Sequence, residues 1–225
     1  MVYRYTNIMM QRQGGQRNMV NAKTIIVYLT KKHDGNWNQI YEDIRNKVQI
    51  DSEEAEKTDL TGAITIIDEE YPTALRNAPK PPFAFFTEGN AEILKDEIEF
   101  LILPKEPTEY EKKALRLVIG KAQERGISTM TVKMGEIEIV RPNGETLKIR
   151  FQDTATSEVC KHARYWASAI ATDIVIVGIR KNSASLMVIA PALDLGKDIY
   201  AVPHQIGEDD ECNRLISQGA IPWVE

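Results

Sequence analysis

The chain has 225 residues, with 28 Lys and Arg against 33 Asp and Glu, so its formal net charge at pH 7 is -5. This acidic balance excludes proteins that coat duplex nucleic acid with their whole surface, because such proteins carry a large positive excess. The composition, with 43% hydrophobic and 27% charged residues, is typical of a globular protein and excludes disordered and fibrous classes. The sequence lacks a run of about 18 apolar residues, so we expect no membrane span.

The first 20 residues contain three arginines but no apolar segment of the kind that secretory signals carry. We expect a flexible tail over residues 1–20. The chain has two cysteines, Cys160 and Cys212, which are too few for a disulfide framework. This cysteine content favours the reducing environment of the cytoplasm.

Two short helices are predicted on either side of a turn at residues 33–35. The second begins with a capping pair, Asn36 and Gln39, and carries an apolar face at helical spacing. That face comprises Trp37, Ile40, Tyr41 and Ile44. The mostly charged segment 51–59 follows as a helix end or linker. We therefore expect a small helical module over residues 21–58 and a second domain over residues 59–225.

Strands and helices alternate through the second domain. Strands are predicted over residues 64–68, 81–89, 97–103, 127–133, 173–179 and 199–203, and helices over residues 107–125, 157–171, 183–195 and 210–218. The run 173–179 is apolar without alternation, which is typical of a parallel strand buried on both faces. Such alternation predicts an α/β fold with an open, mainly parallel sheet and flanking helices. Pro191 should kink or shorten its helix.

The segment 135–151 interrupts this pattern with a predicted β-hairpin. Ile137 and Ile139 alternate with polar residues on one side of the Asn143-Gly144 turn, and Leu147, Ile149 and Phe151 alternate on the other. The predicted helix at 107–125 begins with a capping box formed by Thr108 and Glu111 and ends at Gly126.

The loops that follow the parallel strands are the expected ligand sites of such a sheet. The loop at residues 103–107 has two prolines, an acid and no glycine, whereas a dinucleotide or phosphate site needs backbone amides that approach the phosphates. Neither G-x-G-x-x-G nor G-x-x-x-x-G-K occurs in the chain. We expect no bound cofactor and, without a catalytic triad or paired carboxylates, no enzymatic activity.

Four possible metal ligands occur as Cys160-x-His162 and His204-x7-Cys212. Such a set has the chemistry of a tetrahedral zinc site. The spacing is not that of a short zinc motif, and a cysteine in a helix is more often a small buried side chain. We therefore expect no metal site.

Basic residues concentrate in three places. Those along the helix at 107–125 are interpreted as a solvated face. Lys105, Arg180 and Lys181 instead follow parallel strands, where a cationic rim would face a polyanion. Lys161 and Arg164 lie one helical turn apart, and the adjacent Tyr165 and Trp166 are either core residues or base-stacking residues.

Several motifs resemble the DprA/Smf family of DNA-processing proteins. The segment ITIIDEEYPTALRNAPKPPFAFFTEGN at residues 64–90 is similar to the segment that leads into the Rossmann-like domain of that family. Three C-terminal segments follow in the family's order: SASL at 183–186, GKDIYAVP at 196–203 and ECNRLISQGA at 211–220. The family's glycine-rich middle segment is absent, and the hairpin stands in its place.

The resemblance implies a Rossmann-like domain that binds single-stranded DNA, self-associates as a homodimer and works with a RecA-type recombinase. Lys105 stands where the family has the cation of its first loop, Arg164 falls within a second basic stretch, and Ser183 and Ser185 match a serine motif. We therefore predict a nucleic-acid site formed by Lys105, Lys161, Arg164, Arg180, Lys181, Ser183 and Ser185.

Two alternatives remain open. In the first alternative, the chain is a divergent scaffold of this fold that acts as a protein-interaction module, for instance one derived from a mobile element. A third interpretation, a sensor or hydrolase of a nucleotide-like ligand, is weaker because the chain lacks the Pro-Gly-Gly loop of such hydrolases.

Overall fold

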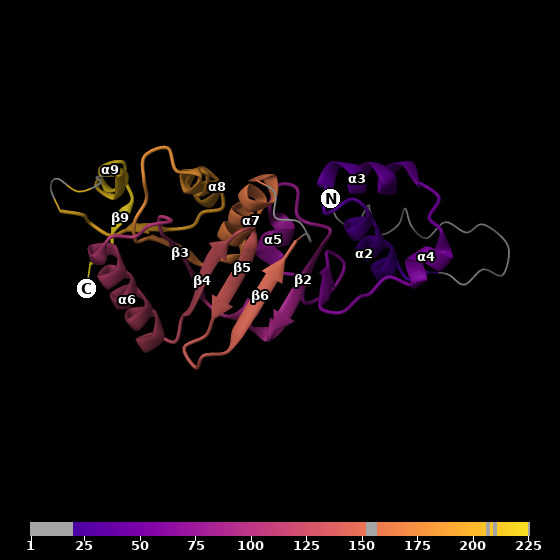
Figure 1. Ribbon diagram of the computed structural model, residues 1–225, viewed down its shortest axis with the longest axis horizontal. Coiled ribbons are helices and arrows are strands. Elements are labelled where there is room, and N and C mark those ends of the chain that lie inside the picture. The colour runs from indigo at the N-terminus through magenta and orange to yellow at the C-terminus, as the bar shows by residue number, and fades with distance from the viewer. Residues whose placement is uncertain (1–19, 152–156, 206–207, 209–210, 225) are drawn as a thin grey trace. The chain divides into compact units, whose positions relative to one another are not determined.

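The computed structural model of the chain describes residues 20–151, 157–205, 208 and 211–224 (Figure 1). Two compact units form the molecule: residues 1–87 with 150–154, here called unit 1, and residues 88–149 with 155–225, here called unit 2. Each is described by itself. None of the helices in the described residues is long and apolar enough to cross a membrane.

Unit 1 contains four helices and a two-stranded ladder among its described residues. They are α2 (Ala22–Lys32), α3 (Trp37–Asn46), α4 (Ser52–Glu56), β1 (Ala63–Thr65), α5 (Thr73–Asn77) and β2 (Ala84–Gly89). Strands β1 and β2 pair in the antiparallel direction, with Ala63 opposite Phe86. The charged segment at 51–59, expected as a helix end or linker, contains the short helix α4, which Asp51 caps by accepting hydrogen bonds from two backbone N–H groups.

The core of unit 1 lies between its helices and its strands. Ile40 and Ile44 are buried against the apolar side of α2, and the rings of Trp37 and Tyr41 stack with their centroids 5.0 Å apart. Asn36 caps the helix, since its side chain accepts a hydrogen bond from the Gln39 N–H. The predicted apolar face and cap of α3 are confirmed.

Unit 2 is built on a mixed open sheet. Its strands are β3 (Ile98–Ile102), β4 (Ser128–Lys133), β5 (Glu136–Val140), β6 (Thr146–Arg150), β7 (Asp173–Ile176), β8 (Ile199–Ala201) and β9 (Ile221–Pro222), in the spatial order β6-β5-β4-β3-β7-β8-β9. The pairs among β4, β3, β7, β8 and β9 are parallel, and those among β4, β5 and β6 are antiparallel. The predicted α/β fold with an open, Rossmann-like sheet is confirmed.

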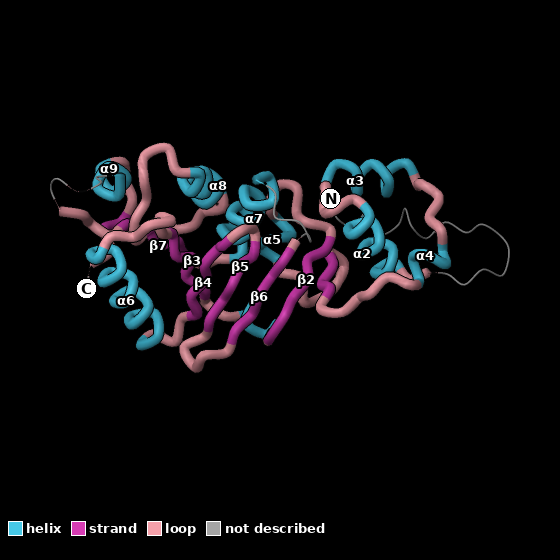
Figure 2. Tube along the Cα trace, in the orientation of Figure 1, coloured by secondary structure: helices cyan, strands magenta, loops and turns pink. Residues whose placement is uncertain are grey.

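The flanking elements of unit 2 are two 3-10 helices and four α-helices among its described residues. They are η1 (Ala91–Lys95), α6 (Glu109–Glu124), α7 (Ser157–Ile170), η2 (Ala184–Val188), α8 (Ile189–Asp194) and α9 (Glu211–Ser217). In α/β sheets, connections between parallel strands are right-handed. Here the connection from β3 to β4 and the connection from β7 to β8 run toward opposite edges of the sheet. Accordingly, α6 lies on one side of the strands and α8 and α9 lie on the other (Figure 2).

The predicted hairpin is formed by β5 and β6. Ile137 lies opposite Ile149 and Ile139 lies opposite Leu147, and all four side chains are fully buried. Gly144 in the turn has a φ of +87°, which a glycine adopts without steric cost. The alternation in the sequence therefore reports which side of the hairpin meets the core.

The single helix predicted over residues 183–195 is wrong in one respect. The segment forms η2 followed by α8, and Pro191 lies in the first turn of α8. Proline lacks the N–H that a continuous α-helix would need at this position, whereas in a first turn that N–H has no intrahelical partner. The segment before the proline accordingly tightens into 3-10 geometry.

Candidate functional site

The loops that follow β3 and β7 meet at one edge of the sheet. The two strands are parallel neighbours, with Ile102 opposite Ile176, so residues 103–108 and 177–183 leave from adjacent points. Their chains continue to helices on opposite sides of the sheet, which makes this a topological switch point, the usual ligand site of doubly wound folds. We call these two loops, with His204 after β8, the carboxyl edge.

An ion pair between two distant parts of the chain joins the two loops. The guanidinium of Arg180 donates to both carboxylate oxygens of Glu111, at 2.5 and 2.8 Å, and to the backbone carbonyl of Glu106 at 3.3 Å. Two parallel N–H to oxygen bonds are the strongest geometry for an arginine and a carboxylate. Arg180, predicted to face a ligand, is therefore also held against the start of α6.

Glu111 is placed by the local structure at the start of α6. The predicted capping box is confirmed: the Thr108 N–H donates to Glu111 Oε2 at 2.7 Å, and the Glu111 N–H donates to the Thr108 hydroxyl at 3.2 Å. The side chain is 1% exposed and lies directly over Gly178, where an added Cβ would come within 2.1 Å of Oε1. Burial raises the pKa of this carboxyl, but the hydrogen bonds from Arg180 and Thr108 outweigh that effect and hold the pKa below its ordinary value.

His204 lies beside this ion pair and is itself buried. Its side chain is 3% exposed, and its Nε2 is 3.6 Å from Glu111 Oε1. Neither ring nitrogen forms a hydrogen bond with any residue that the structure describes. The backbone of His204 is fixed by Asn213 of α9, whose side chain accepts from the His204 N–H and donates to its carbonyl, both at 2.9 Å.

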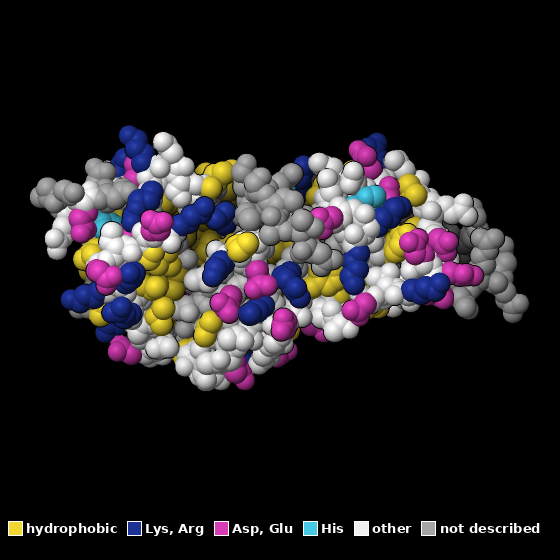
Figure 3. All heavy atoms as spheres, viewed as in Figure 1, with side chains coloured by type: hydrophobic (Ala, Val, Ile, Leu, Met, Phe, Trp, Pro, Cys, Tyr) yellow, Lys and Arg dark blue, Asp and Glu magenta, His cyan; other side chains and the backbone are white. Residues whose placement is uncertain are grey.

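Two of the predicted site residues are exposed cations at this edge. Lys105 and Lys181 follow β3 and β7, and neither forms an ion pair with another described residue. Dark blue side chains gather over α6 and beside α8 and α9, at the same end of unit 2 (Figure 3). The hydrogen bond from Arg180 to the Glu106 carbonyl brings the loop of Lys105 against the loop of Arg180 and Lys181.

The two predicted serines lie at the start of η2. Ser183 caps this helix, since its hydroxyl accepts a hydrogen bond from the Ser185 N–H at 3.2 Å. Both side chains are half-buried. Their observed contact is thus a structural one, and it holds the chain where it leaves the Arg180 loop.

The remaining predicted cations lie on α7, which packs against η2 and α8. Arg164 is half-buried there, and the side chain of Lys161 lies outside the described residues. Trp166 is 5% exposed, so it belongs to the core, and the ring of His162 stacks against it.

The four possible metal ligands do not form a described cluster. No group of three or more His, Cys, Asp and Glu with metal-binding geometry occurs in the part of the chain that the structure describes, and the Cys160 side chain lies outside that part. Cys212 is buried, with its thiol 3.9 Å from the Ile176 carbonyl oxygen.

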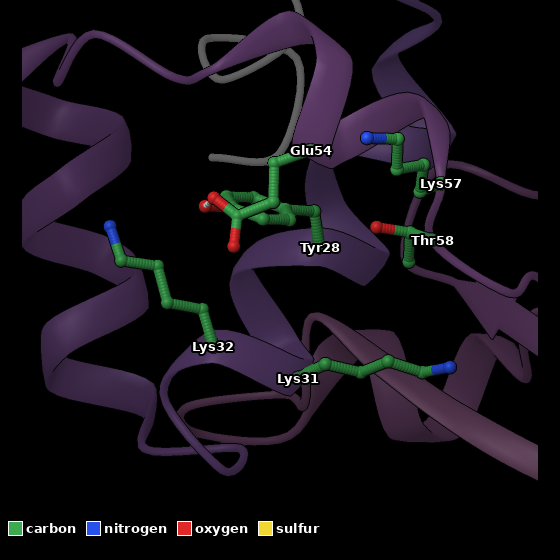
Figure 4. Close-up of a pocket in the computed structure, with 6 residues that line it drawn as sticks. All are labelled: Tyr28, Lys31, Lys32, Glu54, Lys57 and Thr58. Carbon is green, nitrogen blue, oxygen red and sulfur yellow. Dashed lines mark hydrogen bonds between the residues drawn. The ribbon is translucent and has the colours of Figure 1, made fainter.

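Unit 1 carries a shallow pocket of about 270 Å³ between α2 and α4 (Figure 4). It is lined by Tyr28, Lys31, Lys32, Glu54, Lys57 and Thr58. The Tyr28 hydroxyl donates to Glu54 at the centre of the pocket, and Lys31 extends away from them to donate to the Asp59 carbonyl. A phosphate entering here would meet the carboxylate of Glu54, so this pocket is a poorer anion site than the carboxyl edge.

Sequence reasoning missed the central part of the carboxyl edge. Glu111 was expected only as a helix cap, and His204 only as a possible metal ligand. Glu111 and Arg180 are 69 residues apart, and no sequence pattern links them. The one available signal is topological, because Gly178 and Arg180 directly follow a central parallel strand whose neighbour leads into Glu111.

Comparison with known proteins decides the family. The model of the family described as DNA recombination-mediator protein A matches residues 62–131 and 155–225, which together exceed half of the chain. The chain belongs to this family. The expected resemblance to DprA is thereby confirmed, and the edge residues Lys105, Glu111, Gly178, Arg180 and His204 all fall inside the matched segments of this DNA recombination-mediator protein A domain.

Solved structures of DprA proteins share the fold. The chain is similar to DNA processing protein A from Streptococcus pneumoniae, with a TM-score of 0.64 and 15% identity, covering 99% of this chain and 93% of that one. It is also similar to DNA processing protein A from Helicobacter pylori, with a TM-score of 0.60 and 15% identity, covering 72% and 91%. That structure is described as showing a single-stranded DNA binding mode. No curated protein sequence matches the chain significantly.

The hairpin lies outside the segments that the family model matches. Strands β5 and β6 lie in residues 132–154, the segment between the two that the family model matches. The matched segments contain β3, β7, β8 and β9 with their loops, and the hairpin extends the sheet beside β4.

Proposed function

We propose that this protein binds single-stranded DNA at its carboxyl edge as a non-catalytic mediator of recombination or DNA uptake in the cytoplasm. The observation that carries the proposal is the pair of exposed lysines, Lys105 and Lys181, at the switch point of a DprA-family sheet. The Helicobacter pylori protein, which has the same fold, is described as binding single-stranded DNA.

The charge balance of the two loops supports this assignment. Lys105, Arg180 and Lys181 contribute three positive charges, and Glu106 and Glu111 contribute two negative ones. Because the Glu111 carboxylate is 1% exposed and turned to Arg180, a ligand meets the lysines rather than that acid. A chain of phosphates gains from such a site, although the small positive excess limits its strength.

Single-stranded DNA is a better partner for this edge than duplex DNA. Three or four cations are too few to hold a duplex, whose binding depends on many phosphate contacts. A flexible strand can also bend to place successive phosphates against short loops.

Fluorescence anisotropy with labelled oligo-dT and with a duplex of equal length tests this function. We expect tighter binding of the single strand, with a slope of log K on log salt of roughly -2 to -3 for three or four phosphate contacts. Absence of binding at low salt would favour the alternative of a protein-interaction scaffold. Binding of duplex as tight as single strand would contradict the proposed selectivity.

We further propose that the protein self-associates through its C-terminal part and cooperates with a RecA-type recombinase, as the family resemblance implies. Met187 on η2 and Leu193 on α8 support the first point, because they are 57% and 60% exposed large apolar side chains on consecutive elements. Light scattering on the same samples tests self-association, and a strict monomer at high protein concentration would contradict it.

A further inference from the structure

The imidazole of His204 is the buried polar group that the proposed DNA site does not explain. Buried ring nitrogens normally find hydrogen-bond partners, and leaving them without one is costly. Both ring nitrogens of His204 lack a hydrogen-bond partner among the described residues, although only 3% of the side chain is exposed. An imidazole this enclosed is not presented to a DNA strand.

The surroundings of the imidazole contain a carboxylate positioned for its protonated form. Nε2 lies 3.6 Å from Glu111 Oε1, slightly beyond hydrogen-bond distance, so a small ring movement would make the bond. The other groups around it are Tyr110 of α6, whose ring centroid lies 5.4 Å away, and Arg180, which shares Glu111. Glu208 and Cys212 also act electrostatically on Tyr110.

The neutral and the protonated imidazole give this edge different charges. With a neutral imidazole, the charge of Glu111 is opposed by the Arg180 guanidinium, which is held by both carboxylate oxygens. With an imidazolium, one carboxylate is shared between two cations. The edge then carries one more positive charge, and the hold of Glu111 on the 35% exposed Arg180 side chain is weakened.

We propose that His204 is a proton-binding switch, through which mildly acidic pH increases the affinity of the carboxyl edge for single-stranded DNA. The switch works in two ways: it adds a positive charge to the site, and it weakens the hold of Glu111 on the Arg180 guanidinium. Histidine is the side chain that most often serves as a proton-controlled switch in proteins. This inference rests on the proposed DNA binding.

Binding of labelled oligo-dT at pH 8.0 and pH 5.5 in 0.05 M salt tests the switch, since oligo-dT itself has no group that titrates in this range. We expect binding about eightfold tighter at pH 5.5, because one additional cation contributes roughly the salt concentration to the power -0.7. The magnitude of the salt slope should also rise by about 0.7. The His204→Gln variant should bind equally at both pH values.

The two other histidines provide matched controls. His33 pairs with Asp43 in unit 1, and His162 is an exposed residue on α7. The variants His33→Gln and His162→Gln should keep the pH dependence of the unchanged protein. A pH-independent affinity of the unchanged protein, or loss of the pH effect in His162→Gln instead, would overturn the proposal while leaving DNA binding intact.

A second variant tests the switch independently, in case His204→Gln does not fold. Glu111→Gln keeps an oxygen that can accept from the Thr108 N–H but removes the carboxylate charge, so it should bind DNA tightly at pH 8.0 and lose the pH dependence. If no DNA binds at either pH, the proposed function fails. An NMR titration of the histidine rings in the free protein then still decides the switch, because His204 must take up a proton between these pH values.

Discussion

The two ends of the parallel strands in unit 2 differ in which charged side chains they carry and in how these are paired. At the carboxyl edge, lysines project from the loops while the buried acid Glu111 faces inward to Arg180. The opposite end, here called the amino edge, comprises the residues around the starts of β3, β4, β7 and β8. Its charged residues are Asp96, Glu97, Glu99, Asp173 and Asp198 against Arg125, Arg141 and Lys197.

At the amino edge, charged side chains form ion pairs with one another. Arg141 donates to both oxygens of Asp96, at 2.6 and 2.9 Å, and the Ser128 hydroxyl donates to the same carboxylate at 2.9 Å. These bonds lower the pKa of Asp96. Burial raises the pKa of Glu99 and Asp173 and lowers the pKa of Lys197. An excess of acids, with Arg125 and Arg141 already engaged in ion pairs, makes this edge repel a polyanion.

For attraction of a polyanion, the position of each cation matters more than the number of cations. Both edges contain three Lys and Arg residues. Only at the carboxyl edge do two of them extend without an acidic partner among the described residues. The three predictions below test this difference.

The largest expected effect comes from removing the two exposed lysines. The double variant Lys105→Ala, Lys181→Ala should bind oligo-dT about 60-fold more weakly in 0.05 M salt, because two phosphate contacts are lost at roughly eightfold each. Anisotropy measures this directly. The matched control, Arg125→Ala with Lys197→Ala, removes two cations from the amino edge and should change affinity less than about twofold. Equal losses in the two double variants would refute the distinction between the edges.

A smaller effect is expected from Gly178→Ala, which tests the close packing of Glu111. The added Cβ would lie 2.1 Å from Glu111 Oε1, so the carboxylate must move away from its position against Arg180. We expect a loss of about 1–3 kcal/mol in the free energy of unfolding, the usual cost of overpacking a buried site. Denaturant unfolding measures it.

The control for Gly178→Ala is Gly120→Ala. Gly120 lies within α6, and an added Cβ there meets nothing within 4 Å. Alanine should stabilise this helix by about 0.5–1 kcal/mol. If Gly178→Ala were as stable as Gly120→Ala, the contact between Glu111 and Gly178 would not exist in solution.

The smallest effect concerns the pH dependence of stability at the amino edge. Burial raises the pKa of Glu99, so its ionisation favours unfolding, and the stability present below its unfolded pKa is lost as pH rises through its folded pKa. Glu99→Gln should therefore melt higher than the unchanged protein at pH 8, by less than about 3 °C. This difference should shrink as pH falls toward 4. The exposed Glu97→Gln serves as the control, and a melting difference that grows on acidification would show that the sign is wrong.

Local patterns predicted most of the fold. The alternation around Asn143-Gly144 identified the hairpin, and the unbroken apolar run at 173–179 identified the central strand β7. The T-x-x-E pattern at Thr108 predicted a helix start with its cap. Each depends on residues close together in the chain, so the relevant contacts are visible in the sequence. The break at Pro191 was harder, because 3-10 and α geometry share almost the same residue pattern.

The candidate site could be predicted only in part. Lys105, Arg180 and Lys181 were expected at the ends of parallel strands because strand order along the chain indicates which loops share an edge. What each cation contacts there was not visible. Arg180 and Lys181 are adjacent in sequence, yet Arg180 is paired with a buried acid, whereas Lys181 is exposed and has no acidic partner in the part of the chain that the structure describes.

The sequence by itself determined the class of fold and the positions of strands and helices, since these follow from local periodicity, turns and caps. Its motifs also matched the family to which the chain belongs. It also showed that a net charge of -5 leaves room for a narrow cationic edge. Only the tertiary structure decided that Glu111 lies over Gly178 between Arg180 and His204. That arrangement depends on packing between segments about 70 to 90 residues apart, where burial and distance set the electrostatics, and neither quantity is encoded in a local pattern.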